Sequence, residues 1–355
     1  MSDKRVIVGM SGGVDSSVAA YLLKEQGYEV IGVTYDFWHD DDNPEDIYKN
    51  LIDASDAKKV ADVIGIPHYA VNYTKQFKKH VESLFIQEYL NARTPNPCVC
   101  CNKYIKWSAM LESAKQFDAD YVATGHYARI TKLKNGRYAI KNSETAAKDQ
   151  TYVLYNLTQE QLAKTLLPIG DYYKEDIRKI AIEKGLPVAQ KAESQDICFI
   201  DDGDYAGYIK RTWGGNLPPE GNFVSTTGEI LGRHKGFIHY TIGQRKGLGI
   251  AMGHPVFVTE IRPETNEVVI GEPEDVFSDE LYADQLNFMG LSDLTEETRL
   301  MCKIRYSHKG TMCTVTRVSE DKIHVVFDEK VRAITPGQAV VFYDGEYVAL
   351  GGTIL

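Results

Sequence analysis

Residues 11–17, Ser-Gly-Gly-Val-Asp-Ser-Ser, combine the residue types that bind phosphate groups. An apolar, strand-like run comes directly before them and a helix-like run directly after. The adjacent Gly12 and Gly13 let the main chain approach an anion closely, and the start of a helix points unpaired N–H groups at it. The serine hydroxyls add donors, while Asp15 is an acceptor that would help to hold Mg²⁺ or to orient the loop. The segment therefore predicts a nucleotide-phosphate site.

Three of the six cysteines, Cys98, Cys100 and Cys101, crowd into four positions. Six cysteines in 355 residues are not a secreted disulfide framework, so this crowding indicates chemistry. A helix expected from about Asn102 would place Cys101 near its N-terminus, where a thiol has a lowered pKa. The spacing of Cys98 and Cys101 is also that of metal ligands, but no second pair completes a four-ligand zinc site.

The other three cysteines lie far along the chain. Cys198 follows a polar run and precedes an apolar one, which is typical of the edge of a core. Cys302 and Cys313 lie in a tail rich in strand-like segments, and we expect them to be apolar packing residues.

The first part of the chain alternates strand-like and helix-like segments, which predicts an α/β fold with a mostly parallel sheet covered by helices on both faces. Ligands of such sheets bind beyond the carboxyl ends of the strands, where residues 11–17 and Gly125 both fall. A hairpin is expected at 129–142, around Asn135-Gly136, and a further helix at 173–184. The expected strands are 6–10, 29–35, 67–73 and 121–124, and the expected helices are 16–26, 48–64, 77–91 and 103–116.

The composition changes near Gly203, and glycine and proline cluster at 214–221. The segments that follow are short and strand-like, as is typical of small β-barrels or sandwiches. We therefore expect an α/β domain over 1–205, a small β-rich domain over 206–275 and a C-terminal β-barrel over 276–355. The expected later strands include 233–240, 255–261, 267–270, 311–318, 322–327 and 338–343.

The net charge of −10 argues against non-specific binding to nucleic acid. Acidic residues concentrate at 36–46, 201–204 and 272–280, yet 230–254 and 301–317 carry Lys and Arg and no acid. Those two stretches could form a local track for a polyanion, or they could be ordinary solvated surface. No apolar run approaches the roughly 18 residues of a membrane span, and no signal-peptide core opens the chain, so we expect a cytoplasmic protein.

Seven separated motifs together resemble the MnmA/TrmU family of tRNA-specific 2-thiouridylases, over nearly the whole chain. The loop at 11–17 lacks the lysine of a Walker A motif and is similar to the SGGxDS loop of the PP-loop ATP pyrophosphatases. The resemblance implies a doubly wound PP-loop domain (adenine nucleotide alpha hydrolase-like) and a central domain that contacts tRNA. The motifs are GMSGGVDSS (9–17), RTPNP (93–97), CNK (101–103), ATGHYAR (123–129), KDQ (148–150), ESQDICF (193–199) and HYTIGQRKGL (239–248).

The resemblance implies ATP-dependent 2-thiolation of the wobble uridine of tRNA. The enzyme would adenylate the C2 oxygen, a persulfide on Cys198 would deliver sulfur, and Cys101 would release the product through a Cys101–Cys198 disulfide. Asp15 belongs to the implied catalytic set. The implied ATP-binding residues are Gly9, Met10, Ser11, Gly12, Gly13, Val14, Asp15, Ser16, Tyr35 and Gly125, and the implied tRNA-binding residues are Asn96, Pro97, Cys98, Lys148, Asp149, Gln150, Arg305 and Tyr306.

Two positions depart from the family pattern. Cys98 stands where many members carry an aspartate that is a candidate acid/base, and Tyr35-Asp36-Phe37-Trp38 stands where relatives often have Met and Lys. With Cys98 present, Cys98, Cys101 and Cys198 could hold an iron–sulfur cluster, so a persulfide route and a cluster route both stay open.

The implied partners are ATP with Mg²⁺, tRNAs for glutamate, glutamine and lysine, and a sulfur donor that is a cysteine desulfurase or a sulfur-relay protein. The resemblance favours a monomer. Two other functions remain possible on the residues alone. An amide-forming synthetase of the same superfamily would need no cysteines, and an RNA-binding module that has kept a nucleotide fold would not turn over ATP.

Overall fold

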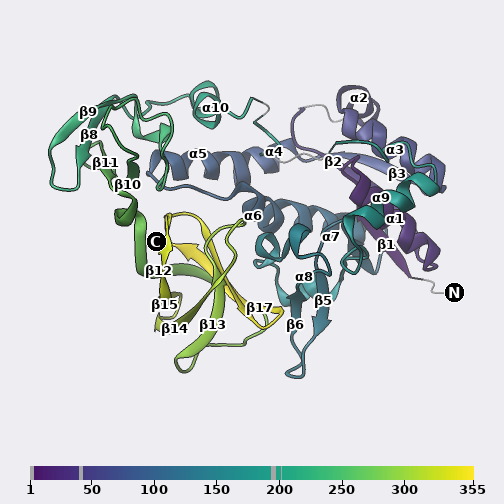
Figure 1. Ribbon diagram of the computed structural model, residues 1–355. Coiled ribbons are helices and arrows are strands. Elements are labelled where there is room, and N and C mark those ends of the chain that lie inside the picture. The colour runs from purple at the N-terminus through teal and green to yellow at the C-terminus, as the bar shows by residue number, and fades with distance from the viewer. Residues whose placement is uncertain (1–3, 40–42, 193–196, 201) are drawn as a thin grey trace.

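The computed structural model describes residues 4–39, 43–192, 197–200 and 202–355. Figure 1 shows three parts, which are a sheet covered by helices, a small sheet at the opposite end and a barrel below and between them. The motif residues 193–196 and parts of the acidic stretches 36–46 and 201–204 lie outside the described residues.

A parallel sheet with strand order β3-β2-β1-β4-β7 forms the N-terminal part. The chain winds from β1 to one side and then returns to β4 on the other, so the predicted doubly wound arrangement is confirmed. The topological switch point, where such sheets bind ligands, lies between β1 and β4. The strands are β1 (Arg5–Gly9), β2 (Glu29–Asp36), β3 (His68–Asn72), β4 (Tyr121–Ala123) and β7 (Thr165–Leu166).

Helices cover both faces of this sheet because its central strand is apolar on both. Val6 and Val8 belong to a core with side chains of α1 (Val14–Glu25), α3 (Ile52–Ile64) and α9 (Lys174–Glu183). Ile7 points to the other face and packs in the cluster that contains α7 (Trp107–Gln116). Successive strand residues face opposite ways, so three buried residues in a row need a cover on each side.

The single helix expected at 48–64 is wrong. Two helices, α2 (Pro44–Asn50) and α3, meet at Leu51, whose φ of −107° and ψ of 103° are extended. The break turns the first residues of α3 against the glycine loop, where a Cβ on Gly12 would lie 2.8 Å from the Cα of Asp53.

Two long helices each contain one π-helical turn. One runs through α4 (Thr74–Phe77), η1 (Lys78–Glu82) and α5 (Ser83–Leu90), and the other through α6 (Pro97–Cys101), η2 (Asn102–Lys106) and α7. The second begins at Pro97, not at 102–103 as expected, because Asn96 Oδ1 accepts the Val99 N–H at 3.3 Å and Pro97 takes the first helical position. A π turn adds a residue, so Cys101 and Lys106, five apart, share a helix face.

The predicted hairpin is confirmed as β5 (Arg129–Lys132) and β6 (Tyr138–Lys141), and β6 joins the sheet of the predicted C-terminal barrel at Tyr347. The barrel closes because β12 pairs with both β15 and β17. The strands of the barrel are β12 (Phe277–Phe288), β13 (Thr298–Lys303), β14 (Thr311–Ser319), β15 (Lys322–Arg332), β16 (Ala339–Asp344) and β17 (Tyr347–Ile354). The short helices that precede the barrel in the chain are η3 (Ala146–Lys148), η4 (Thr151–Leu154), α8 (Gln159–Ala163) and η6 (Pro273–Val276).

The central part is a sheet of order β10-β11-β8-β9 that follows α10 (Tyr205–Thr212). The strand expected over 233–240 ends early, because Gly236 takes a φ of +106° and the helical turn η5 (Phe237–His239) follows. The strands are β8 (Gly221–Ser225), β9 (Ile230–His234), β10 (Phe257–Arg262) and β11 (Glu267–Gly271).

The domain limits at 205/206 and 275/276 stay predictions. In the described part of the chain, no helix is long and apolar enough to cross a membrane.

Gly12 gives a test of how tightly α3 packs on the glycine loop. Gly12 and Gly27 both have positive φ, at 67° and 88°, but a Cβ on Gly27 meets nothing within 4 Å. Gly27→Ala should therefore lower the free energy of unfolding by the dihedral cost alone, about 1–2 kcal/mol. Gly12→Ala should cost more and should also weaken ATP binding, because the start of α3 must shift. Denaturant unfolding and ATP titration measure both, and equal effects of the two variants would refute the packing.

Candidate active site

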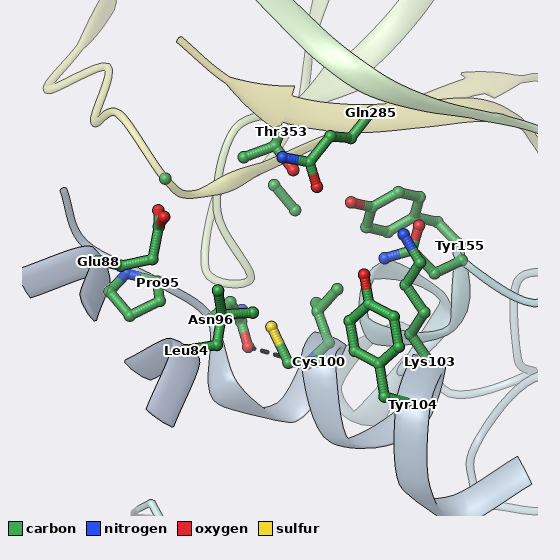
Figure 2. A pocket seen from close by; sticks show the side chains of 14 residues that line it. Leu84, Glu88, Pro95, Asn96, Cys100, Lys103, Tyr104, Tyr155, Gln285 and Thr353 are labelled. Atoms are coloured by element: carbon green, nitrogen blue, oxygen red, sulfur yellow. Dashed lines mark hydrogen bonds between the residues drawn. The ribbon is translucent and has the colours of Figure 1, made fainter. Parts of the chain in front are cut away.

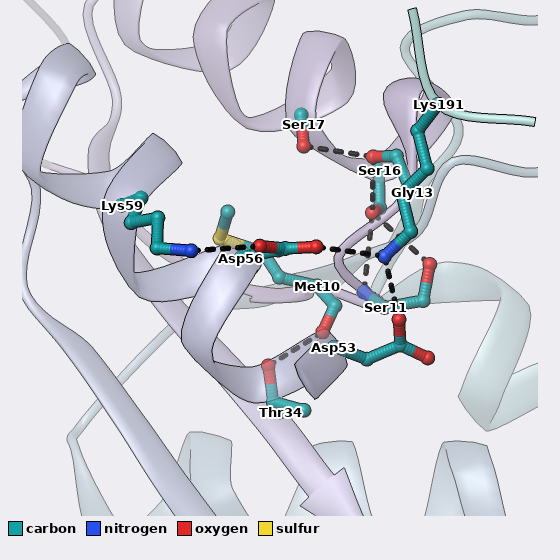
Figure 3. A network of polar contacts seen from close by, with 10 residues as sticks. All are labelled: Met10, Ser11, Gly13, Ser16, Ser17, Thr34, Asp53, Asp56, Lys59 and Lys191. Carbon is teal, nitrogen blue, oxygen red and sulfur yellow. Dashed lines mark hydrogen bonds and ion pairs between the residues drawn. The ribbon is translucent and has the colours of Figure 1, made fainter. Parts of the chain in front are cut away.

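The glycine loop leaves N–H groups of α1 open toward the end of the sheet. Its hydroxyls are tied back to the loop, since Ser16 Oγ accepts the Ser11 N–H at 3.1 Å and Ser17 Oγ donates to the Gly13 carbonyl at 2.7 Å (Figure 3). Gly13 is the N-cap of α1, and a glycine has no side chain to cover the N–H groups of the first turn. This geometry suits an anionic ligand at the helix start.

Gly125, which follows β4, lies directly against this loop. A Cβ on Gly125 would come within 2.6 Å of the Asp15 carbonyl carbon and 2.8 Å of the Ser16 Cα, so only glycine allows the approach. The structure therefore brings two of the predicted ATP-binding segments together at the switch point. The Tyr35 side chain turns away into the core, where its hydroxyl bonds Ser113 Oγ at 2.9 Å, so only its main chain is available to a ligand.

The Asp15 carboxylate bonds side chains from two other segments and is partly exposed. Lys174 Nζ lies 2.7 and 2.8 Å from its two oxygens, and the Tyr127 hydroxyl donates to it at 2.7 Å. This arrangement supports the predicted role of Asp15 in orienting the loop, and the predicted help in holding Mg²⁺ stays a prediction. Sequence reasoning missed Lys174, because a lysine at the start of a predicted helix carries no signal of burial.

A second network, made of ion pairs, lies on the other side of the loop. Lys191 Nζ pairs with Asp53 at 2.7 Å and Asp56 at 2.9 Å, both on α3 (Figure 3). Burial alone would raise the pKa of Asp56, but Lys191 and Lys59 hold it below its usual value. These pairs fasten the segment that leads toward Cys198 beside the phosphate loop.

Phe199 anchors the segment that carries Cys198. Its ring is buried among aromatic rings of Trp38, Phe77, Phe85 and Tyr208, with centroids 5.2–6.3 Å away. Trp38 also packs on Phe77 at 4.9 Å, which gives the unusual Phe37-Trp38 pair a structural role. Cys198 itself is exposed, so its predicted position at the edge of a core is confirmed.

Three thiols and one lysine form a common site, to which the helix of α6, η2 and α7 contributes Cys98, Cys101 and Lys106. Cys98, Cys101 and Cys198 all act electrostatically on Lys106, and Cys98 and Cys198 both act on Cys101. Burial raises the pKa of the Cys101 thiol to about 12, although Lys106 opposes this. The predicted lowered pKa of Cys101 is therefore wrong, because the helix begins a turn earlier and the thiol lies inside the core and not at a helix end.

Lys106 is a second functional candidate that sequence reasoning missed. Burial opposes its charge, but the three thiols raise its pKa above the usual value. Lys106 also helps burial to lower the pKa of His126 to about 3, so this imidazole is neutral beside the cation. Within the described residues no carboxylate pairs with Lys106. An α-helical period puts Lys106 on another face from Cys101, so only the π turn reveals it.

The predicted tRNA-binding residues converge on the same region, but several already have partners. Burial raises the pKa of Tyr306, and its phenol lies within electrostatic reach of Cys98, Lys148 and Asp149. Asp149 accepts the N–H groups of Ser143 at 2.8 Å and Thr151 at 3.1 Å.

Gln150 and Asn96, also predicted to bind tRNA, have structural roles as well. Gln150 Oε1 accepts the Tyr127 N–H at 2.8 Å, and Asn96 caps α6. Pro97 is buried in the first turn of that helix.

Cys100 belongs to a different pocket, between α5, α6 and the barrel. Figure 2 shows its thiol directed into this pocket, opposite Lys103, Tyr104 and Tyr155. Burial raises the pKa of Cys100 to about 11. The three crowded cysteines are therefore not equivalent. Cys302 and Cys313 are fully buried in the barrel, so their predicted packing role is confirmed.

The thiols do not fit a metal cluster as they are arranged. Among the residues that the structure describes, no group of three or more His, Cys, Asp or Glu side chains is placed to hold a metal ion. Neither the zinc alternative nor the iron–sulfur alternative for Cys98, Cys101 and Cys198 finds support in this arrangement.

Three family models match consecutive parts of the chain. They are the tRNA methyl transferase HUP domain over 4–202, the tRNA methyl transferase PRC-barrel domain over 208–272 and the aminomethyltransferase beta-barrel domain over 278–355.

Full-length relatives are closely similar in sequence. The tRNA-specific 2-thiouridylase MnmA of Lachnoclostridium phytofermentans is 56% identical to this chain over 357 residues. The alignment covers 99% of this chain and 99% of the relative. The protein of the same name from Clostridioides difficile is 55% identical over 355 residues, which are 99% of this chain and 98% of the relative. With the phosphate loop and the thiol site in place, and with this identity over the full length, the chain belongs to the tRNA-specific 2-thiouridylase family.

Proposed function

We propose that this protein is an ATP-dependent sulfurtransferase that converts the wobble uridine of tRNA to 2-thiouridine. The observation that carries the proposal is the site where Cys98, Cys101 and Cys198 lie within electrostatic reach of Lys106, with Tyr306 of the barrel within electrostatic reach of Cys98. The full-length relatives named tRNA-specific 2-thiouridylase support it.

ATP activates the uridine in the first step of the proposed reaction. The C2 oxygen of the base attacks the α-phosphorus, the uridine O2–P bond forms and pyrophosphate leaves. The loop from Gly9 to Ser16 is suited to hold the departing pyrophosphate, because it offers close main-chain approach at a helix start. The main chain at Tyr35 and at Gly125, which lies against this loop, would hold the adenosine part. The pair of Lys174 with Asp15 orients the loop for this step.

Sulfur transfer follows in two displacements. The terminal sulfur of a Cys198 persulfide attacks C2, and the C2–O bond breaks with AMP as leaving group. Cys101 then attacks the Cys198 sulfur as its thiol proton passes to the departing uridine sulfur, so that a Cys101–Cys198 disulfide forms and 2-thiouridine leaves with the electron pair of the broken S–S bond. The exposed Cys198 is accessible to a donor, while the buried Cys101 is held back for the second displacement.

Lys106 supplies the positive charge that both displacements need. A persulfide anion, a thiolate and the departing AMP all carry negative charge, and a fixed cation in a partly enclosed site stabilises such charge. With Cys98 in place of a carboxylate, Lys106 is the charged group among these thiols.

The two other candidate functions explain less of this site. An amide-forming synthetase leaves the three thiols and Lys106 without a role, and a binding module leaves the open phosphate loop without one. We propose that glutamate, glutamine and lysine tRNAs are the substrates and that a cysteine desulfurase or a relay protein loads Cys198. A cytoplasmic monomer remains our prediction.

Replacement of Cys198 and Asp15 tests the proposed chemistry. Wild-type protein with ATP, Mg²⁺, cysteine and a cysteine desulfurase should retard unmodified glutamate tRNA in a mercury-containing gel. Cys198→Ser and Asp15→Asn should each lose at least about 100-fold in thiolation rate, because one lacks the sulfur carrier and the other the oriented loop. Cys100→Ser is the matched control and should retain the rate. No wild-type retardation would overturn the proposal, and loss in Asp15→Asn alone would show that Cys198 does not carry the transferred sulfur.

Lys106→Met tests the proposed cation. Single-turnover thiolation with saturating ATP and tRNA should slow by about 100-fold, since one preorganised charge is removed. ATP affinity should not change, and Lys106→Arg should recover part of the rate. Lys103→Met, which removes a lysine of the neighbouring pocket, serves as the control. An unchanged single-turnover rate in Lys106→Met would show that the cation has no part in sulfur transfer.

A further inference from the structure

The motif at 239–248 has no role in the steps above, and the structure places it against the barrel. Gly243 takes a φ of +83°, and a Cβ there would lie 2.6 Å from the Cβ of Ala333. Its carbonyl accepts a hydrogen bond from Arg332 at 3.3 Å, and its N–H donates to the Val258 carbonyl at 2.8 Å. The central sheet and the end of β15 are therefore in close contact through this motif.

An open, basic pocket lies at this contact. Lys246 and His239 of the motif line it from the central part, and Arg305 and Arg332 line it from the barrel. The described residues that form its wall include no Asp or Glu. Lys246 comes from the acid-free stretch 230–254 and Arg305 from the acid-free stretch 301–317, so the two stretches meet in space.

The three permanent charges of this pocket lack counter-charges. Within the described residues, Lys246, Arg305 and Arg332 form no ion pair. Arg332 stacks on the ring of Phe257 at 5.0 Å, which orients the guanidinium but leaves its charge. Elsewhere in the barrel arginines are paired, as Arg299 is with Asp328. In a protein of net charge −10, a pocket without acids is a specific feature.

The position of the pocket identifies the polyanion that fits it. Arg305 lies in its wall, and the next residue, Tyr306, packs on the ring of Tyr152 and lies within electrostatic reach of Cys98 at the thiol site. A strand whose base reaches the thiols would carry its next phosphates past Arg305 toward Lys246 and Arg332. Arginine and lysine side chains along an open surface are the usual contacts of an RNA backbone, whereas a small free anion is normally enclosed.

We propose that this pocket is a cradle for backbone phosphates of the tRNA strand that leads away from the target uridine. The inference rests on the proposed function and extends it to Lys246, Arg332 and His239. These residues bind the strand without base contacts, so they set affinity and register for every substrate tRNA alike.

Salt-dependent binding tests the cradle without any chemistry. The affinity of full-length protein for unmodified glutamate tRNA is measured by fluorescence anisotropy between 50 and 300 mM KCl, without ATP or desulfurase. Lys246→Gln and Arg332→Gln should each weaken binding about fivefold and lower the slope of log K against log salt by about 1. The double variant should lower it by about 2. Lys134→Gln, an exposed lysine at the tip of the β5–β6 hairpin, should change neither.

Thiolation by the same variants separates this inference from the proposed function. At saturating tRNA the double variant should reach the wild-type rate. An unchanged affinity and slope in the double variant would overturn the cradle and leave the thiolase intact. Competition by millimolar phosphate or pyrophosphate, with an unchanged tRNA slope, would assign the pocket to a small anion instead and would also overturn it.

Discussion

A single buried cluster joins the nucleotide-binding sheet to the barrel, and the geometry of the site depends on it. Trp107 of α7, Tyr152 of η4 and Tyr343 of β16 are fully buried members of this cluster. Tyr152 donates from its hydroxyl to the Ala339 carbonyl at 2.8 Å, and its ring meets that of Tyr306. Because close-packed interiors resist sliding, the loop with Tyr306 keeps a fixed position relative to the helix with Cys98 and Cys101.

The same region links the phosphate loop to the segment expected to touch RNA. Gln150 bonds Tyr127 twice, through its side chain and its N–H, and the Tyr127 hydroxyl bonds Asp15. Asp15 in turn holds Lys174. A displacement at residues 148–150 is therefore transmitted toward the loop through these hydrogen bonds. The segment at residues 148–150 and the glycine loop are physically connected in this fold.

Local sequence patterns predicted what depends on local physics. The alternation of apolar strand-like and helix-like segments predicted the parallel sheet, and the Asn135-Gly136 turn predicted the hairpin. The glycine loop predicted the phosphate site. The break at Leu51 and the early helix start at Pro97 were missed, because they are decided by contacts with Gly12 and by the cap from Asn96. Lys174 and Lys106 could not be found from the sequence either. Their roles follow from burial against distant carboxyl or thiol groups, and for Lys106 from a π turn that no helical period anticipates.

The contrast between the buried Cys101 and the exposed Cys198 has a consequence for oxidative stress. Peroxide reacts with thiolates that solvent reaches, so a buried thiol with a pKa near 12 is a poor target at neutral pH. Damage falls on the exposed thiols Cys98 and Cys198, and a sulfenic acid on Cys198 can still condense with the Cys101 thiol to a disulfide. Because that disulfide is the same one that the proposed catalytic cycle produces, the reductant that completes a turnover also repairs the enzyme.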